Sequence, residues 1–311
     1  MRMAATQNQV KLNRAGIDAQ TKIYAVLGFP ISHSLSPLIQ NMALQACGIN
    51  AVYLAMEVRP TDLKSAVTGL RAIHVAGFNI TVPHKQTVIP FLDEISEEAR
   101  QVGAVNTVKN IEGCLWGTTT DAQGAIESLS EEGIPLTGQS IVIVGAGGAA
   151  RSLAFGLAGR ARIKSLTVLA RRKNQWGVLI KDIKRYYPSL PIQGETLSEE
   201  ILKEILPETD LLIQTTSLGM IPHEGETLIP KDLLQRNLTV FDIVYNPLQT
   251  RLLKEASERG CRTVNGLGML VHQGAAAFEI WHGQKAAVRE MKKILLNQPP
   301  ITISATQGGI N

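Results

Sequence analysis

Short apolar runs alternate with longer amphipathic stretches along most of the chain. The runs at 23–28, 77–82 and 140–145 contain many β-branched residues and predict strands. The stretches at 37–48 and 61–74 have the apolar spacing of helices. Strands separated by helices of about 10–15 residues are typical of βαβ units that form a parallel sheet. The pattern therefore predicts an α/β fold.

The same alternation returns in the second half of the chain. Further strands are predicted at 165–170, 210–216 and 238–244, and a helix at 149–159. Short apolar runs with little alternation are typical of strands that are buried on both faces. A hairpin at 106–118 predicts a local antiparallel part in the first half. We therefore expect two α/β units, of which the first has a mostly parallel sheet.

Composition narrows the class of protein. The 31 Lys and Arg against 27 Asp and Glu give a net charge of +4 that is spread along 311 residues, which argues against a nucleic-acid binder. The three cysteines lie far apart and the six histidines lack ligand spacing, so no disulfide, zinc or haem site is predicted. No run is long enough to span a bilayer, and residues 1–21 lack the apolar segment of a secretory signal. We expect a cytoplasmic protein without metal or membrane contact, and an organelle transit peptide is the less favoured interpretation of the basic N-terminus.

A glycine-rich sequence, GAGGAA at 145–150, follows a predicted strand and precedes a predicted helix. It fits the pattern G-x-G-x-x-A, in which the first glycine makes a tight turn and the second lets the backbone approach a pyrophosphate. The helix start would offer N–H groups and a positive dipole to the phosphates. A glycine turn without a ligand is the alternative. The residues that we predict to bind a dinucleotide here are Gly145, Ala146, Gly147, Gly148 and Ala149.

The end of the next strand indicates which dinucleotide binds. An NAD site usually has Asp or Glu there, which accepts hydrogen bonds from the ribose. This chain has Arg171 and Arg172 instead, and a guanidinium can bind a 2′-phosphate with two hydrogen bonds. We therefore expect NADP(H) as the cofactor, with a solvated run of charges as the alternative.

Two groups of polar residues in the first half could carry chemistry. Ser34 and Ser36 precede Pro37 at a predicted helix start. Ser36 before a proline is a good helix cap, whereas two hydroxyls beside a helix start could clamp a substrate carboxylate, and the spacing leaves both open. Thr81 and Lys85 lie at a strand end, where α/β proteins place active-site groups. Lysine can transfer protons, although most lysines are solvated surface charges.

Asn106 and Asp121 also lie at or beyond predicted strand ends. Each has an ordinary structural interpretation, because Asn106 could make a turn and Asp121 could cap a helix. His84 stands next to Lys85 and could compete for its role, but we expect it to be a loop residue.

Eight motifs across about residues 23–296 resemble those of the shikimate dehydrogenase family. In chain order they are SHSLSP, NITVPHK, GAVNT, a loop that ends in TD, GAGGAAR, TSLGM, VYNP and GLGMLVHQGA. The resemblance implies an NADP-dependent oxidoreductase that acts on a CH–OH group and reversibly reduces 3-dehydroshikimate to shikimate, a step of aromatic amino-acid biosynthesis. It implies an α/β substrate-binding domain formed by 22–122 plus 268–296 and a Rossmann-like NADP-binding domain at 123–267. The remaining 1–21 and 297–311 are expected to be disordered tails.

The resemblance also implies roles for single residues. Lys85 transfers the proton to or from the reacting oxygen, and Asp121 orients the lysine and hydrogen-bonds the same region. The substrate is expected to be bound by Ser34 and Ser36 at its carboxylate and by Thr81, Asn106, Asp121, Tyr245 and Gln273 around its hydroxyls. The cofactor is expected to be bound by 145–149, Arg171 and Arg172, with Ile243 and Gly266 near the nicotinamide and Glu97 at a further position.

Four residues in three motifs depart from the family pattern. Thr119 stands where Asn is usual, Ala170 and Arg172 change the N-R-T motif, and Gln214 replaces a common Asn. The first change touches the loop that orients Asp121, so it bears on substrate affinity.

Several other functions stay open at this stage. An NAD-accepting quinate/shikimate dehydrogenase is the nearest, and a specialist for an amino-substituted analogue is a further one. Another lysine-using dehydrogenase, such as a methylene-folate enzyme, would not need the serine pair. A non-catalytic NADP-binding sensor would not need Lys85 or Asp121. The expected partner is a small-molecule substrate, and a homodimer is left open.

Overall fold

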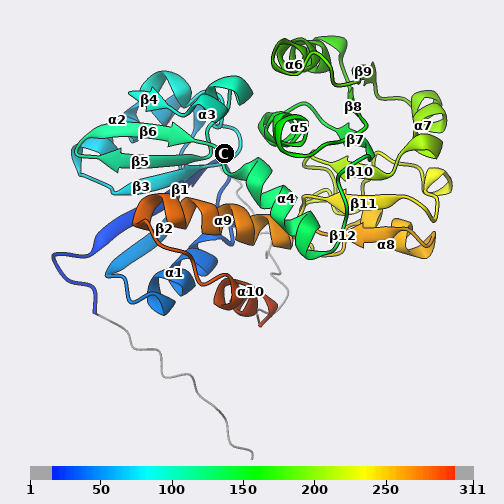
Figure 1. Cartoon of the computed structure of the whole chain (residues 1–311). Coiled ribbons are helices and arrows are strands. Elements are labelled where there is room, and N and C mark those ends of the chain that lie inside the picture. Colours follow the sequence, from blue (N-terminus) through cyan, green and yellow to red (C-terminus); the bar gives the residue numbers. More distant parts are fainter. Residues whose placement is uncertain (1–15, 298–311) are drawn as a thin grey trace, which may run out of the picture.

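The protein, a computed structural model that describes residues 16–297, has two six-stranded sheets (Figure 1). Each half of the chain contributes one sheet. Helices α4 (Asp121–Glu131) and α9 (Leu267–His282) lie side by side between the two sheets and pack against each other. The predicted α/β fold with a mostly parallel first sheet is confirmed.

The first sheet has the strand order β2-β1-β3-β5-β6-β4. The first three of these strands are parallel, and β5 and β6 form the predicted antiparallel hairpin. The hairpin turns at Glu112 and Gly113, which both have positive φ. The strands are β1 (Lys22–Gly28), β2 (Ala51–Glu57), β3 (Gly77–Ile80), β4 (Glu94–Ile95), β5 (Thr107–Ile111) and β6 (Cys114–Thr118).

Helices cover both faces of this sheet, which explains the apolar run of β1. Tyr24 and Val26 pack into one core with residues of α1 (Ser36–Ala46), α9 and α10 (Val288–Leu296). Ala25 and Leu27 point to the opposite face and pack with α2 (Leu63–Ala72). Since successive side chains of a strand alternate between faces, a strand covered on both sides needs apolar residues at every position. The short helix α3 (Glu97–Val102) lies between β6 and the helix of the second unit at 148–160.

The second sheet is entirely parallel, with the order β12-β11-β10-β7-β8-β9. This is the doubly wound dinucleotide-binding order, whose switch point lies between β7 and β10. Its strands are β7 (Ser140–Val144), β8 (Ser165–Ala170), β9 (Ile192–Thr196), β10 (Leu211–Gln214), β11 (Thr239–Asp242) and β12 (Arg262–Val264), and its helices are α5 (Gly148–Arg160), α6 (Lys173–Tyr186), α7 (Glu199–Ile205) and α8 (Arg251–Glu258).

The N-terminal tail was predicted to cover residues 1–21, but residues 18 and 21 already contact the folded chain. Asp18 and Thr21 both hydrogen-bond the side chain of Asn50, so the chain is already anchored before β1. Residues 1–15 and 298–311 of the expected tails lie outside the described residues. The division at 122/123 and 267/268 stays our proposal. Within 16–297, none of the helices is both long and apolar enough to span a membrane.

Candidate active site

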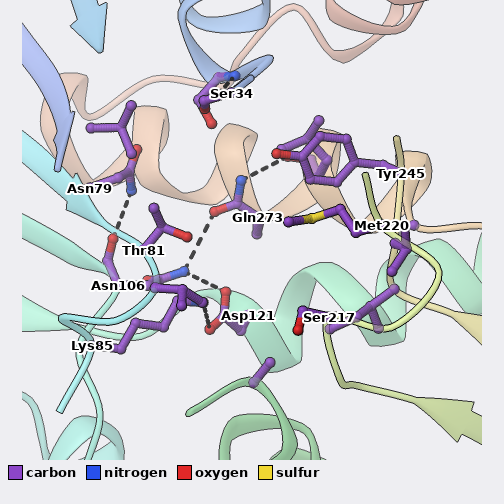
Figure 2. A pocket seen from close by; sticks show the side chains of 18 of the residues that line it. Ser34, Asn79, Thr81, Lys85, Asn106, Asp121, Ser217, Met220, Tyr245 and Gln273 are labelled. Carbon is purple, nitrogen blue, oxygen red and sulfur yellow. Dashed lines mark hydrogen bonds and ion pairs between the residues drawn. The ribbon is translucent and has the colours of Figure 1, made fainter. Parts of the chain in front are cut away.

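A cavity of about 270 Å³ lies between the two sheets and takes its walls from both units (Figure 2). The first unit supplies loops that follow β1 and β3, and the second supplies loops that follow β7, β10 and β11. Active sites of open α/β sheets lie in this position, at the carboxyl ends of the strands. The predicted site residues that line this central cavity are Ser34, Ser36, Thr81, Lys85, Asn106, Asp121, Ala149, Ile243, Tyr245, Gly266 and Gln273.

Lys85 and Asp121 form an ion pair at one end of the central cavity. The Lys85 Nζ lies 2.6 Å from Asp121 Oδ2, and the two side chains are 15% and 4% exposed. Figure 2 shows them meeting in the lower part of the view, with Ser34 at the opposite end. Asp121 is the first residue of α4, but the helix has no side-chain cap, so the capping interpretation of Asp121 is wrong. Its carboxylate is directed into the cavity instead.

Asn106 holds the second oxygen of this carboxylate. Its Nδ2 donates to Asp121 Oδ1 at 2.8 Å, and its Oδ1 accepts from the backbone N–H of Thr120 at 2.9 Å. The Asn106 side chain is 2% exposed. It therefore ties the segment before β5 to the start of α4, which is more than a turn requires.

Two residues that we did not assign to the site extend this network into the core. The hydroxyl of Tyr53, on β2, donates to Asn79 Oδ1 at 2.6 Å. The Nδ2 of Asn79, on β3, donates to the backbone carbonyl of Asn106 at 2.9 Å. Asn79 stands two residues before Thr81, so the alternation of a strand puts both side chains on one face, but no local pattern marks Tyr53 as the partner of Asn79. Burial raises the pKa of Tyr53 well above its usual range, so its hydroxyl stays a donor.

The serine pair differs in detail from the expected cap. The cap position of α1 is Leu35, without a side-chain cap, and Ser36 is already helical. The side chain of Ser34 hydrogen-bonds the helix start instead, because its Oγ accepts from the N–H of Ser36 at 3.3 Å. The Ser36 cap is therefore wrong, and its hydroxyl is not used for capping. The neighbouring His33 also lines the cavity, and burial lowers its pKa, so its imidazole is neutral at pH 7.

The second unit contributes a wall that follows β11. Ile243 and Tyr245 lie on this wall, and Gly266 packs so closely on the Ile243 carbonyl that no Cβ would fit there. Burial raises the pKa of Tyr245 to about 12, so its hydroxyl is protonated at neutral pH. Gln273, on α9, reaches into the cavity between the two units, and its Oε1 lies 3.5 Å from Asn106 Nδ2.

The glycine loop has the geometry that an anion site needs. Gly145 has a φ of +121°, which other residues rarely adopt, and Gly147 is the cap of α5. The first turn of α5 carries no acidic residue. The free N–H groups of a helix start and its dipole favour bound phosphate. Arg171 and Arg172 are exposed at the carboxyl end of the neighbouring strand β8. These residues fit a phosphorylated dinucleotide.

Two residues lie apart from this arrangement. Glu97 is exposed at the start of α3, where it pairs with Arg100 at 3.5 Å, and it does not line the cavity. His84 is a loop residue as expected, but it is 1% exposed and its Nε2 lies 2.6 Å from the Val58 carbonyl. It therefore faces away from Lys85 and does not compete for the role.

Comparison with known proteins agrees with the geometry. The family model described as the shikimate dehydrogenase substrate binding domain matches residues 26–108, and that of the shikimate 5′-dehydrogenase C-terminal domain matches 266–296. The shikimate dehydrogenase (NADP(+)) of Alkaliphilus metalliredigens is 44% identical over 91% of this chain and 99% of its own. The chain belongs to the shikimate dehydrogenase family.

Two further members of the shikimate dehydrogenase family match along most of their length. The shikimate dehydrogenase (NADP(+)) of Thermococcus kodakarensis is 47% identical over 86% of this chain and 93% of its own. The crystal structure of the Thermus thermophilus shikimate 5-dehydrogenase in complex with NADP(H) and shikimate superposes with a TM-score of 0.77 at 34% identity, covering 88% of this chain and 98% of that one. The likeness therefore extends over both units.

Thr119, which departs from the pattern of the shikimate dehydrogenase family, does not face the cavity. It is buried, and its Oγ1 lies 3.3 Å from the Oγ of Ser152 on α5. The substitution thus connects the loop that carries Asp121 to the helix that follows the glycine loop.

Proposed function

We propose that this protein is an NADP-dependent shikimate dehydrogenase that reversibly reduces 3-dehydroshikimate to shikimate. One observation carries the proposal: the buried Lys85–Asp121 ion pair lies in a cavity that also holds the serine pair and the end of the glycine loop. A substrate bound in this cavity would therefore have a proton-transfer group, a site for its carboxylate and a bound dinucleotide around it. A sensor module would have no need for the first of these.

The ion pair provides the proton transfer. When bound, NADPH supplies a hydride to the ring ketone. Protonated Lys85 donates from Nζ to the developing alkoxide, and in the oxidation of shikimate the neutral amine takes this proton back. Asp121 orients the amine through the 2.6 Å contact, and Asn106 fixes the carboxylate from the other side. These two contacts therefore fix the orientation of the lysine amine in the cavity.

The remaining cavity residues bind and orient the substrate. We assign its carboxylate to the hydroxyls of Ser34 and Ser36, which both line the cavity. Ser34 lies at the end opposite Lys85 (Figure 2). Thr81, Tyr245 and Gln273 line the space between and offer donors to the ring hydroxyls. Because Tyr245 keeps its proton, it serves as a neutral donor.

The second unit binds the cofactor. We assign the pyrophosphate to Gly145–Ala149 at the start of α5 and the 2′-phosphate to Arg171 and Arg172. Ile243 and Gly266 line the cavity and would stand beside the nicotinamide. This division supports the domain boundaries that we predicted, at 123 and 267. A cytoplasmic location is also our proposal, supported by Cys47, Cys114 and Cys261, which are all free thiols.

Initial rates test the proposal. We expect the purified full chain to form NADPH from NADP⁺ when shikimate is present, which the absorbance of NADPH measures. We expect a lower kcat/KM when quinate replaces shikimate or NAD⁺ replaces NADP⁺. A chain that binds NADPH without turnover would be a sensor module. A preference for quinate and NAD⁺ would identify the protein as an NAD-accepting quinate/shikimate dehydrogenase instead.

A further inference from the structure

Arg151 connects the two units immediately after the glycine loop. It lies in the first turn of α5, and its side chain is only 12% exposed. Its Nε donates to the backbone carbonyl of Val102, the last residue of α3, at 2.7 Å. Its Nη2 donates to Asp182 Oδ2, on α6, at 2.8 Å. A guanidinium that hydrogen-bonds both the carbonyl at a helix C-terminus and a carboxylate makes a strong, directional contact.

The segment that Arg151 holds leads directly to the proton-transfer residues. Three residues after Val102, the N–H of Val105 donates to the backbone carbonyl of Lys85 at 2.8 Å. The next residue, Asn106, donates to Asp121. Val102 thus stands three residues before a hydrogen bond to Lys85 and four residues before one to Asp121.

The glycine loop also lies close to the side chain of Lys85. A methyl group at Gly148 would lie 3.4 Å from Lys85 Cβ and Cδ. One residue beyond Arg151, Ser152 lies against Thr119 in the loop before Asp121. The start of α5 therefore lies against the chain around the ion pair, and its hydrogen bonds to that chain come from Ser152 and from the charged side chain of Arg151.

We propose that Arg151 is a positioning residue, which holds the glycine loop in register with Lys85 and Asp121. This inference rests on the proposed function, because it concerns the alignment of the hydride donor with the proton donor. A displacement of about 1 Å can lower a rate about 100-fold, although substrate binding is unchanged. Arg151 does not line the central cavity, so its removal is expected to affect turnover more than substrate binding.

The helix pair provides a matched control. Arg160 is also on α5 and binds Glu98, on α3, at 2.7 Å, but its side chain is 44% exposed and it lies at the far end of the helix. Both arginines join the same two helices, whereas only Arg151 adjoins the glycine loop. The variants to compare with the wild type are Arg151→Ala, Arg151→Lys and Arg160→Ala, each measured for kcat, both KM values and Tm.

We expect Arg151→Ala to lower kcat about 10-fold or more while the KM for shikimate changes less than about threefold. Arg151→Lys should lie between this variant and the wild type, because an ammonium lacks the fork that reaches two acceptors at once. Arg160→Ala should keep the kcat of the wild type.

Three results would overturn the positioning role: an unchanged kcat in Arg151→Ala, an equal loss in Arg160→Ala, or a rise in the KM for NADP⁺ alone. If Arg151→Ala does not fold, Arg151→Lys carries the test, and a wild-type kcat in that variant overturns the proposal. An inactive wild type in the same assay would instead refute the proposed function.

Discussion

Asp242 offers a test of the electrostatics beneath the central cavity. It ends β11, is completely buried, and precedes Ile243 in the cavity wall. Its Oδ2 accepts from the Thr250 hydroxyl at 2.7 Å, and its Oδ1 accepts from the N–H of Val244 at 3.0 Å. Among residues 16–297, no Lys or Arg forms an ion pair with it. The Gln214 amide also donates to Oδ1, at 3.4 Å. Burial raises the pKa of this carboxyl to about 6, and the hydrogen bonds from Thr250 and Val244 only partly oppose the effect.

The sign of the pH dependence follows from the raised pKa. In the unfolded chain the carboxyl ionises near its ordinary pKa of 3.8, and in the folded chain near 6. The folded state therefore binds the proton more tightly, and the stability that this provides is complete below pH 3.8 and is lost as the pH rises through 6. A difference of about two pH units corresponds to about 3 kcal/mol of unfolding free energy.

The change Asp242→Asn removes this dependence. Asparagine keeps an oxygen for the Val244 N–H and places an amide beside the Thr250 hydroxyl. We expect the stability of the variant relative to the wild type, that is, its free energy of unfolding minus that of the wild type, to increase by about 2–3 kcal/mol between pH 4 and pH 7.5. Urea unfolding at a series of pH values measures this difference. Asp232→Asn, at an exposed site, corrects for the change in net charge. Parallel stability curves for Asp242→Asn and the wild type would refute the reasoning.

Two further substitutions test the cofactor site and the buried network. Arg171→Asp is expected to lower kcat/KM for NADP⁺ and to shift the preference toward NAD⁺, because the carboxylate repels the 2′-phosphate; undiminished use of NADP⁺ in the steady state would remove Arg171 from the site. Tyr53→Phe leaves the buried Asn79 Oδ1 without its donor and should cost about 1–3 kcal/mol of unfolding free energy. A chemical denaturation curve that matches the wild type would show that the bond contributes nothing.

Much of the fold follows from local sequence patterns. The apolar run of β1 and the GAGGAA turn predict a buried strand and a strand-to-helix junction, because each depends on neighbours in the chain. The sequence patterns do not predict the short strands β4, β9 and β12. Two of the three residues of β12 are exposed, so the strand has little hydrophobic pattern, and its place is set by pairing with β11.

The sequence identifies the residues of the site but not the contacts between them. Lys85 and Asp121 were identified through motifs, and their positions at strand ends suggested one edge of a sheet. Their direct contact depends on how β3 and α4 pack, which the residue spacing does not encode. Tyr53 and Arg151 could not be assigned, because each acts on a partner that lies far away in the sequence. The serine cap failed for a local reason, since the helix begins one residue earlier than the proline suggests.

The turnover of Lys85→Met tests the central claim most directly. Methionine keeps much of the side-chain length and removes the proton that the lysine transfers. We expect kcat for shikimate oxidation to fall by about 10²–10⁴, with a KM for shikimate close to that of the wild type and unchanged binding of NADP⁺. Turnover near the wild-type rate in a folded, NADP⁺-binding variant would contradict the account.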